Sequence, residues 1–341
     1  VRIGGRDGDD AGPPWQAIDH RFRWLHDYVG AGDGTPAPID ETVAQLANIY
    51  RRLNDALHSP DPDGALQELI ASGALRPLNQ HTDQLAADYG EAVSAQVGRI
   101  AASVTEVAAG GALQQIRDAW RADVLPTCTA ALNGRYPLDR ASRTDVNLDD
   151  FSRLFAPGGM IDAFFQAHLR ELVDTSRRPW RMAGADIGIA EGSLRQFEHA
   201  AMIRDALFAG GGGPSARFEI TPVGLDASAV RVLLVVDGQS LEYAHGAPRP
   251  TAMQWPGPGA GLSRLSFAPQ LPDGSSSVSH TGPWSLFRLL DQGRVQGTGL
   301  PDRFSVTLGV GGRTATFDVR VGSVFNPFTL TALERFRCPS L

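Results

Sequence analysis

The 341-residue chain contains no lysine, so all 31 of its basic side chains are arginine. A Schiff-base mechanism needs a lysine amine, and a Walker A loop needs a lysine beside the phosphates. Both kinds of site are therefore excluded within this chain. Acidic side chains number 38, which gives a formal net charge of -7. This balance argues against a nucleic-acid partner, because phosphate backbones are bound by basic faces.

Cysteine is scarce, with only Cys128 and Cys338 present. Two cysteines exclude a disulfide-rich scaffold and a cysteine-based zinc site, which needs more ligands at close spacing. The pair could form one long-range disulfide in an oxidising compartment, or stay as two buried free thiols. Of these two states we expect the free thiols, because an unpaired cysteine behaves as a small buried hydrophobe.

Long apolar runs are also absent. No stretch of about 18 apolar residues occurs, so the sequence predicts no transmembrane helix, and it shows no signal peptide. The chain begins at Val1, and we expect it to be a fragment whose targeting elements lie upstream. With 42% hydrophobic and 20% charged residues it is globular, and its length suits two or three domains.

The first part of the chain predicts helices. Residues 1–14 are rich in Gly, Asp and Pro, which predicts a disordered leader. From 15 to 209 the sequence predicts a helical domain, with a possible division into two subdomains near 126–135. Apolar side chains recur at spacings of three and four in one stripe, and we interpret this stripe as the core-facing side of a bundle helix. Its members are Val43, Leu46, Tyr50, Leu53 and Leu57.

A glycine-rich segment, residues 210–214, precedes a change in period from helical spacing to two. We interpret 210–214 as a hinge and residues 215–341 as a β-sandwich domain. Two sharp turns between strands are predicted, at Asp237-Gly238 and at Gly311-Gly312, because these dipeptides favour two-residue hairpins.

One stretch of the second domain differs from the strands around it. Residues 282–291 carry apolar side chains at helical spacing after a Gly-Pro pair, which predicts a short helix with Pro283 in its first turn. A single apolar helix among strands must bury its face against a sheet, so we expect Trp284 and Phe287 in the core. The fold class is therefore α+β and multidomain: an all-α helical domain, then a β-sandwich domain with one inserted short helix.

Catalytic and metal-binding patterns are weak. Asp145 opens an alternation of acidic and amide groups, but an EF-hand needs Gly at the sixth position and Glu at the twelfth. The chain has Asp150 and Ala156 there. The eight histidines are scattered, and no HExxH motif occurs. We predict no catalytic residue, no cofactor and no metal, and therefore no enzyme.

Trp255 is the one candidate for a partner-binding residue. It lies in a stretch rich in Pro and Gly, Gln254-Trp255-Pro256-Gly257, which we interpret as a loop. Two interpretations of its side chain stay open. A buried structural tryptophan is the more frequent case, and an exposed anchor for a protein partner is the alternative.

An ordered series of short motifs runs from Cys128 to Leu341. The residues that carry it are Arg135, Tyr136, Pro157, Gly158, Phe165, Trp180, Trp284, Arg288, Asn326, Pro327, Phe328 and Cys338. In this order the motifs resemble the C-terminal region of the IcmF/TssM family. The helical first third of the chain carries few of them.

The resemblance implies a component of the bacterial type VI secretion system that upstream helices anchor in the inner membrane. This chain resembles the distal periplasmic part of the family, which does not itself span the membrane. In the family that part binds the outer-membrane lipoprotein TssJ and assembles with TssL and with other copies of itself. The resemblance therefore implies a non-enzymatic periplasmic scaffold whose β domain binds a TssJ-like lipoprotein and so links the two membranes.

Two other functions stay open. A cell-envelope enzyme such as a cell-wall hydrolase is conceivable, because two of the 38 acidic side chains can converge in a fold. A module that binds peptidoglycan or another carbohydrate would rest on the sandwich and on Trp255.

Overall fold

The computed structural model describes residues 14–30, 36–183, 187–323 and 325–341. The predicted leader, residues 1–14, lies outside this range except for its last residue. The chain forms two compact units: one comprises residues 1–116 with 184–188, and the other comprises 117–183 with 189–341. The second unit thus combines helices with the sandwich, whereas the sequence pattern places a domain boundary at the glycine-rich segment. The hinge role of that segment stays a prediction.

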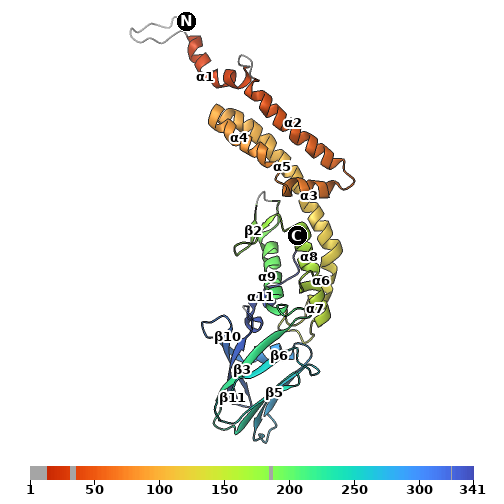
Figure 1. Ribbon diagram of the computed structural model, residues 1–341, viewed down its shortest axis with the longest axis vertical. Coiled ribbons are helices and arrows are strands. Elements are labelled where there is room, and N and C mark those ends of the chain that lie inside the picture. Colours follow the sequence, from red (N-terminus) through yellow and green to blue (C-terminus); the bar gives the residue numbers. More distant parts are fainter. Residues whose placement is uncertain (1–13, 31–35, 184–186, 324) are drawn as a thin grey trace, which may run out of the picture. The chain divides into compact units, whose positions relative to one another are not determined.

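The first unit is helical (Figure 1). Its helices are α1 (Pro14–Val29), α2 (Pro38–Leu57), α3 (Pro62–Ala71), α4 (Arg76–Tyr89) and α5 (Glu91–Ala119), the last of which continues into the second unit. Leu66, Leu78 and Leu85 are among the side chains that form its core. Tyr28 donates a hydrogen bond to Thr42 inside this core, and Thr42 also contacts His81.

The stripe predicted on α2 is only partly correct. The helix exists, and Leu46 and Leu53 pack against the core. However, Val43, Tyr50 and Leu57 are 57%, 69% and 46% exposed. The most buried positions of α2 are instead Thr42, Ile49 and Ala56. Helices α1, α3 and α4 contact α2, and the buried side of α2 carries Thr42, Ile49 and Ala56, so only part of the predicted apolar stripe is covered.

The second unit begins with helices. It contains a π-helical turn (Trp120–Val124), α6 (Leu125–Leu132), α7 (Leu148–Phe155), α8 (Met160–His168) and α9 (Glu191–Leu207), with a two-stranded hairpin of β1 (Val173–Asp174) and β2 (Arg181–Met182). Aromatic rings fill the space between the helices. The ring of Trp120 lies 4.9 Å from Phe164 and 5.3 Å from Phe197.

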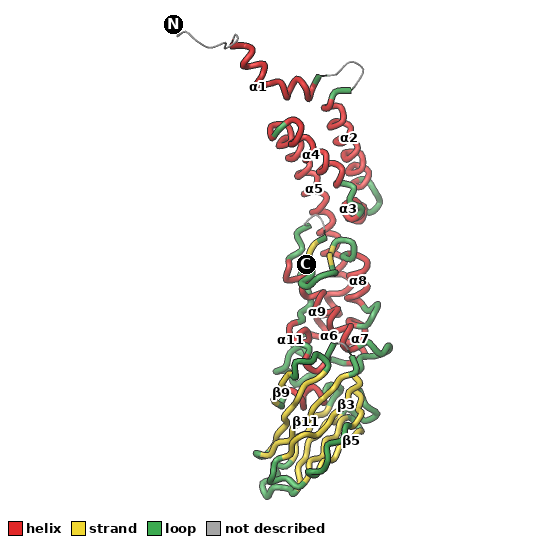
Figure 2. Tube along the Cα trace, turned by 60° about the vertical axis from the view of Figure 1, so that its left-hand side comes forward, coloured by secondary structure: helices red, strands yellow, loops and turns green. Residues whose placement is uncertain are grey.

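The rest of the second unit is an antiparallel β-sandwich (Figure 2). The five-stranded sheet has the order β6-β3-β11-β10-β9, and the four-stranded sheet has the order β5-β4-β7-β8. The strands are β3 (Ala216–Leu225), β4 (Arg231–Val236), β5 (Gln239–Tyr243), β6 (Thr251–Trp255), β7 (Leu262–Ala268), β8 (Ser277–Thr281), β9 (Arg294–Gly297), β10 (Arg303–Val310) and β11 (Arg313–Val321). Buried and exposed side chains alternate along β3 and β11, as expected when one face of a sheet packs on a core.

Both predicted hairpin turns are confirmed. Val236 pairs with Gln239, and the two residues between them, Asp237 and Gly238, have φ angles of 45° and 83°. Gly311 and Gly312, with φ angles of 59° and 76°, connect β10 to β11 in the same way. A two-residue turn with both φ angles positive matches the twist of the strands that it joins.

The inserted helix is also confirmed, and with it the α+β fold class. Helix α10 (Ser285–Asp291) contacts β7, β8, β9 and β10, and Trp284, Leu286 and Phe287 are buried. The helix begins at Ser285 with Trp284 at its N-cap position, so Pro283 precedes the first turn instead of lying in it. After the sandwich come a 3-10 turn (Pro327–Thr329) and α11 (Thr331–Arg335). In the part of the chain that the structure describes, no helix combines the length and the apolar character that crossing a membrane requires.

Candidate functional site

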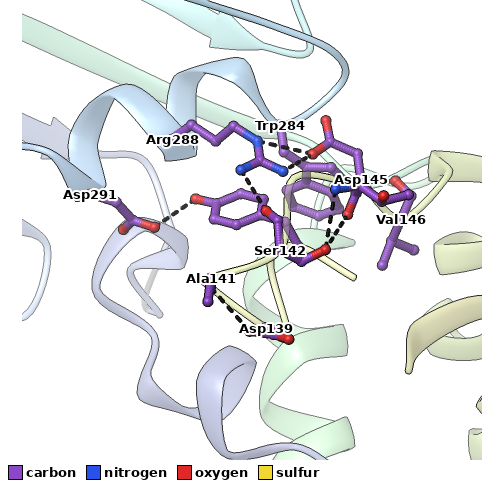
Figure 3. Close-up of polar contacts among 10 residues, drawn as sticks. Asp139, Ala141, Ser142, Asp145, Val146, Trp284, Arg288 and Asp291 are labelled. Atoms are coloured by element: carbon purple, nitrogen blue, oxygen red, sulfur yellow. Dashed lines mark hydrogen bonds and ion pairs between the residues drawn. The ribbon is translucent and has the colours of Figure 1, made fainter. Parts of the chain in front are cut away.

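Three of the family residues, Tyr136, Trp284 and Arg288, lie where the helices of the second unit contact the sandwich. The loop between α6 and α7 is closed on itself, because Tyr136 N–H donates to Thr144 O and Val146 N–H donates to Tyr136 O. This loop contacts α10 through a set of polar groups that we call the clamp (Figure 3). The clamp consists of Tyr136, Arg140, Ser142, Asp145, Val146, Trp284, Arg288 and Asp291.

Arg288 is the central cation of the clamp. Its Nε donates to Asp145 Oδ1 at 3.0 Å, and its Nη2 also contacts that oxygen (Figure 3). Its Nη1 donates to Ser142 O at 2.9 Å, and its guanidinium carbon lies 4.0 Å from the centre of the Tyr136 ring. The side chains of Arg288 and Asp145 are only 16% and 15% exposed. Removal of either partner would leave the other charge largely buried and unpaired.

Tyr136 connects the loop to the other end of α10. Its hydroxyl donates to Asp291 Oδ2 at 2.7 Å. Burial, followed by the nearby charge of Asp291, raises the pKa of Tyr136 far above its usual range, so the phenol stays protonated and remains a donor. On the more exposed side Arg140 contacts both Asp291, at 3.4 Å, and Glu334, at 2.5 Å. The clamp therefore also reaches α11.

Trp284 joins the clamp to an aromatic centre. Its side chain is 0% exposed, and its indole N–H donates to Val146 O at 2.8 Å. Its ring lies 5.0 Å from Phe151 of α7, 4.9 Å from Trp255 and 5.1 Å from Phe287. The prediction that Trp284 and Phe287 are buried in the core is therefore confirmed. Side chains of both the helices and the sandwich form this core.

Trp255 does not lie in a loop, contrary to the sequence interpretation. It is the last residue of β6, it is 1% exposed, and its indole N–H donates to Pro283 O at 2.8 Å. An exposed anchor for a partner is therefore wrong, and the buried structural interpretation holds. The Pro and Gly residues that predicted a loop follow the strand, and Gly257 N–H donates to the buried carboxylate of Asp237.

A second connection is made by residues 326–340, which we call the C-terminal strap. At its start the side chain of Asn326 accepts a hydrogen bond from Phe328 N–H. The Phe328 ring lies 5.2 Å from both Phe218 of β3 and Phe287 of α10. Further along, the ring of Phe336 lies 4.9 Å from Phe155 of α7. The strap thus leads from the sandwich core to the helices.

Near its end the strap forms a disulfide between Cys338 and Cys128 of α6, with the two Cα atoms 6.0 Å apart. The expectation of two free thiols is therefore wrong. Hydrogen bonds hold the last residues in place, because Trp120 Nε1 donates to Pro339 O and Ser193 Oγ donates to Ser340 O. The cysteines are 210 residues apart, and nothing local in the sequence reports such a pairing.

The remaining family residues lie in the helical part. Arg135 directly precedes the clamp residue Tyr136, and Pro157 and Gly158 form the turn between α7 and α8, where Gly158 has a φ angle of 72°. The rings of Phe165 and Trp180 are 5.0 Å apart. The structure thus brings Tyr136, Trp284 and Arg288 together in the clamp, and it places Asn326, Pro327, Phe328 and Cys338 on the strap.

Sequence reasoning missed the acidic partners of the clamp. The sequence pattern indicates Asp145 only as the start of an incomplete calcium loop, and Asp291 only as the last residue of the helix predicted at 282–291. The available signal was the spacing of Arg288 and Asp291, which lie one helical turn apart beside an apolar face. Among the described residues, no three His, Cys, Asp or Glu side chains group as metal ligands. The clamp can therefore hold the helices and the sandwich together. Its charged side chains pair with each other and are not directed into an open ligand site.

A shallow hollow with a volume of about 700 Å³ lies on the outer face of the five-stranded sheet. Its lining includes Arg217 and Glu219 of β3, Gln254 of β6 and Arg320 of β11. Strand β6 forms one edge of this sheet. The side-chain amide of Gln239 bonds to both the N–H and the C=O of Gln254, at 2.9 and 2.7 Å, and so satisfies part of that edge.

Two family models match the chain. They are the type VI secretion protein IcmF helical domain, over residues 111–213, and the IcmF C2-like domain, over residues 218–323. A curated relative, the type VI secretion system component TssM1 of Pseudomonas aeruginosa, is 36% identical in an alignment of 332 positions that covers 94% of this chain. The chain belongs to the IcmF/TssM family. It spans 30% of the length of TssM1.

Solved structures of TssM and of type VI secretion membrane complexes share this fold. The TssM C-terminal domain from EAEC is 22% identical with a TM-score of 0.58, and the match covers 66% of this chain and 96% of that one. A chain of a type VI membrane complex is 20% identical with a TM-score of 0.75, over 94% of this chain and 70% of that one. A type VI secretion system membrane core complex gives a TM-score of 0.69 over the same shares, also at 20% identity.

Proposed function

We propose that this chain is a non-enzymatic scaffold segment of a type VI secretion membrane complex. The observation that carries the proposal is the 36% identity to TssM1 over almost the whole chain. The engagement of the clamp charges with one another supports it, because a catalytic centre would instead leave titratable groups directed at a cleft. A hydrolase would need two convergent carboxylates, and the two that line the hollow on the five-stranded sheet, Glu219 and Asp302, are both paired with Arg320. The carbohydrate-binding alternative loses Trp255, on which it rested.

This proposal includes a periplasmic location for the segment. The disulfide between Cys128 and Cys338 supports that compartment, because disulfides persist in the periplasm and are rare in the cytosol. In the complete protein we expect TssL and further copies of the same chain as partners.

The β domain is the proposed contact for a TssJ-like outer-membrane lipoprotein. The hollow on the outer face of the five-stranded sheet supports this location, since it adjoins the edge strand β6 and contains the exposed arginine Arg217. Edge strands can add a strand from a partner, and exposed arginines are frequent anchors of interfaces. We expect an interface of standard size, roughly 1,600 Å² of total buried surface.

The test is a binding titration of the full chain with the soluble part of the cognate lipoprotein. Arg217→Glu combined with Gln254→Arg changes the charge and the bulk of the side chains in the hollow. This double variant should raise the Kd at least about tenfold, which is a loss of about 1.4 kcal/mol in binding free energy. Tyr50→Glu is the control, since Tyr50 is 69% exposed on α2 of the first unit. Normal binding of the sandwich variant together with loss of binding by Tyr50→Glu would move the contact to the helical unit.

A further inference from the structure

The strap and the disulfide create a second covalent route between the helices and the sandwich. Along the main chain, Cys128 of α6 is followed by α7, α8 and α9 before β3 begins at Ala216, a distance of 88 residues (216 minus 128). Through the disulfide, α6 is joined to Cys338, and β11 ends at Val321, only 17 residues before it (338 minus 321). The sandwich is therefore attached to α6 by one long and one short connection.

The shorter of two parallel connections becomes taut first. A fully extended chain spans at most about 3.3–3.6 Å per residue, so the short route reaches about 60 Å and the long route about 300 Å. When α6 and the sandwich are pulled apart, the strap is fully extended while the segment that contains α7 to α9 still has slack. The extension between the two parts is then limited by the strap.

We propose that the Cys128–Cys338 disulfide makes the strap the connection that carries tension between α6 and the sandwich, and that it so shields helices α7 to α9 from that tension. The inference rests on the proposed scaffold function, because a protein that links two membranes is loaded along its chain. Non-covalent contacts place the strap for this role. Phe328 is packed in the sandwich core, and Gln196 of α9 accepts a hydrogen bond from Arg337 N–H at 2.7 Å.

The test is single-molecule pulling on the full chain, with one handle at the N-terminus and one in the exposed Asp273-Gly274 turn of the sandwich. Both handles are attached through peptide tags, so that no cysteine is added. From Asp273 the route to α6 has 65 residues through Cys338 (338 minus 273) and 145 residues through the main chain to Cys128 (273 minus 128). The wild-type chain should therefore extend about 280 Å less than the Cys128→Ser/Cys338→Ser variant.

A second handle position serves as the matched control. With the handle in the Pro157-Gly158 turn, the main-chain route from Cys128 has 30 residues (158 minus 128) and is the shorter one with or without the disulfide. Wild type and variant should then extend equally. Equal extension from the Asp273 handle, or rupture of α7 to α9 before the strap is taut in the wild type, would overturn the proposal.

A failure of the variant to fold and a loss of lipoprotein binding can both be distinguished from a failure of this proposal. If the double variant does not fold, as judged by circular dichroism, the wild-type protein reduced on the tether with a phosphine replaces it, and the same 280 Å difference is expected. Lipoprotein binding does not enter the measurement. A failed pulling experiment therefore refutes the load path alone, and a failed binding titration refutes the lipoprotein contact alone.

Discussion

Replacement of Trp284 by alanine should destabilise the second unit strongly. The indole is fully buried and contacts three other aromatic rings, and its N–H satisfies the carbonyl of Val146. Removal of a large core aromatic costs about 3–5 kcal/mol, and an unsatisfied buried carbonyl adds about 1 kcal/mol. We therefore expect Trp284→Ala to lower the free energy of unfolding of this unit by about 4–6 kcal/mol.

Urea unfolding of the full chain, followed by far-UV circular dichroism, measures this loss. The transition of the second unit should move to lower urea without a change in slope. For a unit of this size the melting temperature should fall by about 8–24 °C. Trp284→Phe keeps most of the ring packing and loses the hydrogen bond, so we expect a smaller loss of about 1–3 kcal/mol.

Val230→Ala is the control for this experiment. Val230 belongs to the same unit and is 66% exposed, so its replacement should change stability by less than about 0.5 kcal/mol. An unchanged melting temperature of Trp284→Ala, combined with lost partner binding, would refute the reasoning. Trp284 would then be a binding residue and not part of the core.

Three further predictions concern the clamp and the disulfide. In a denaturation curve, Arg288→Ala should lower the free energy of unfolding by about 2–4 kcal/mol, because it leaves Asp145 buried and unpaired. The double variant with Asp145→Ala should lose at least about 1 kcal/mol less than the two single variants together, because the second change removes the unpaired charge. Strict additivity would show that the two groups do not interact. Reduction of the Cys128–Cys338 disulfide should destabilise the unit by about 5 kcal/mol in the chain-entropy description of a 210-residue loop, and a melting scan with and without reductant checks this. The pKa of Tyr136 is raised in the folded state, so its stabilising contribution is complete below pH 10 and declines above it, as the unfolded state releases the proton that the folded state keeps. Denaturation at pH 8 and at pH 11 should therefore show a smaller alkaline loss for Tyr136→Phe than for wild type, and equal losses would contradict the assignment.

The local elements of the fold were predictable from the sequence. The turns at Asp237-Gly238 and Gly311-Gly312 and the helix α10 depend on residues within a few positions of each other, so their patterns report them directly. Strand β6 was missed because the Pro and Gly residues after Trp255 dominate its pattern. The stripe on α2 predicted a helix, but which side of that helix is buried depends on where α3 and α4 lie.

The partners in the candidate site were not predictable in this way. Arg288 and Asp145 are 143 residues apart, and each has many opposite charges in the chain as alternative partners. Burial of Trp255 follows from its position between α10 and the sheets, whereas its sequence neighbours indicated a loop. Tyr136, Trp284 and Arg288 all belong to the series of family motifs, but the series does not predict that these residues are in contact.

By itself the sequence determined the helical character of the first part, the two tight turns, the helix α10, the α+β class and the family pattern, since these depend on short-range spacing and on residue type. Tertiary structure alone decided that Cys128 and Cys338 pair, that α7 to α9 lie inside the loop which this pair closes, and that the charges of the clamp meet. The physical reason is that such contacts join residues more than a hundred positions apart. Only the packing of helices against the sandwich brings those residues within bonding distance.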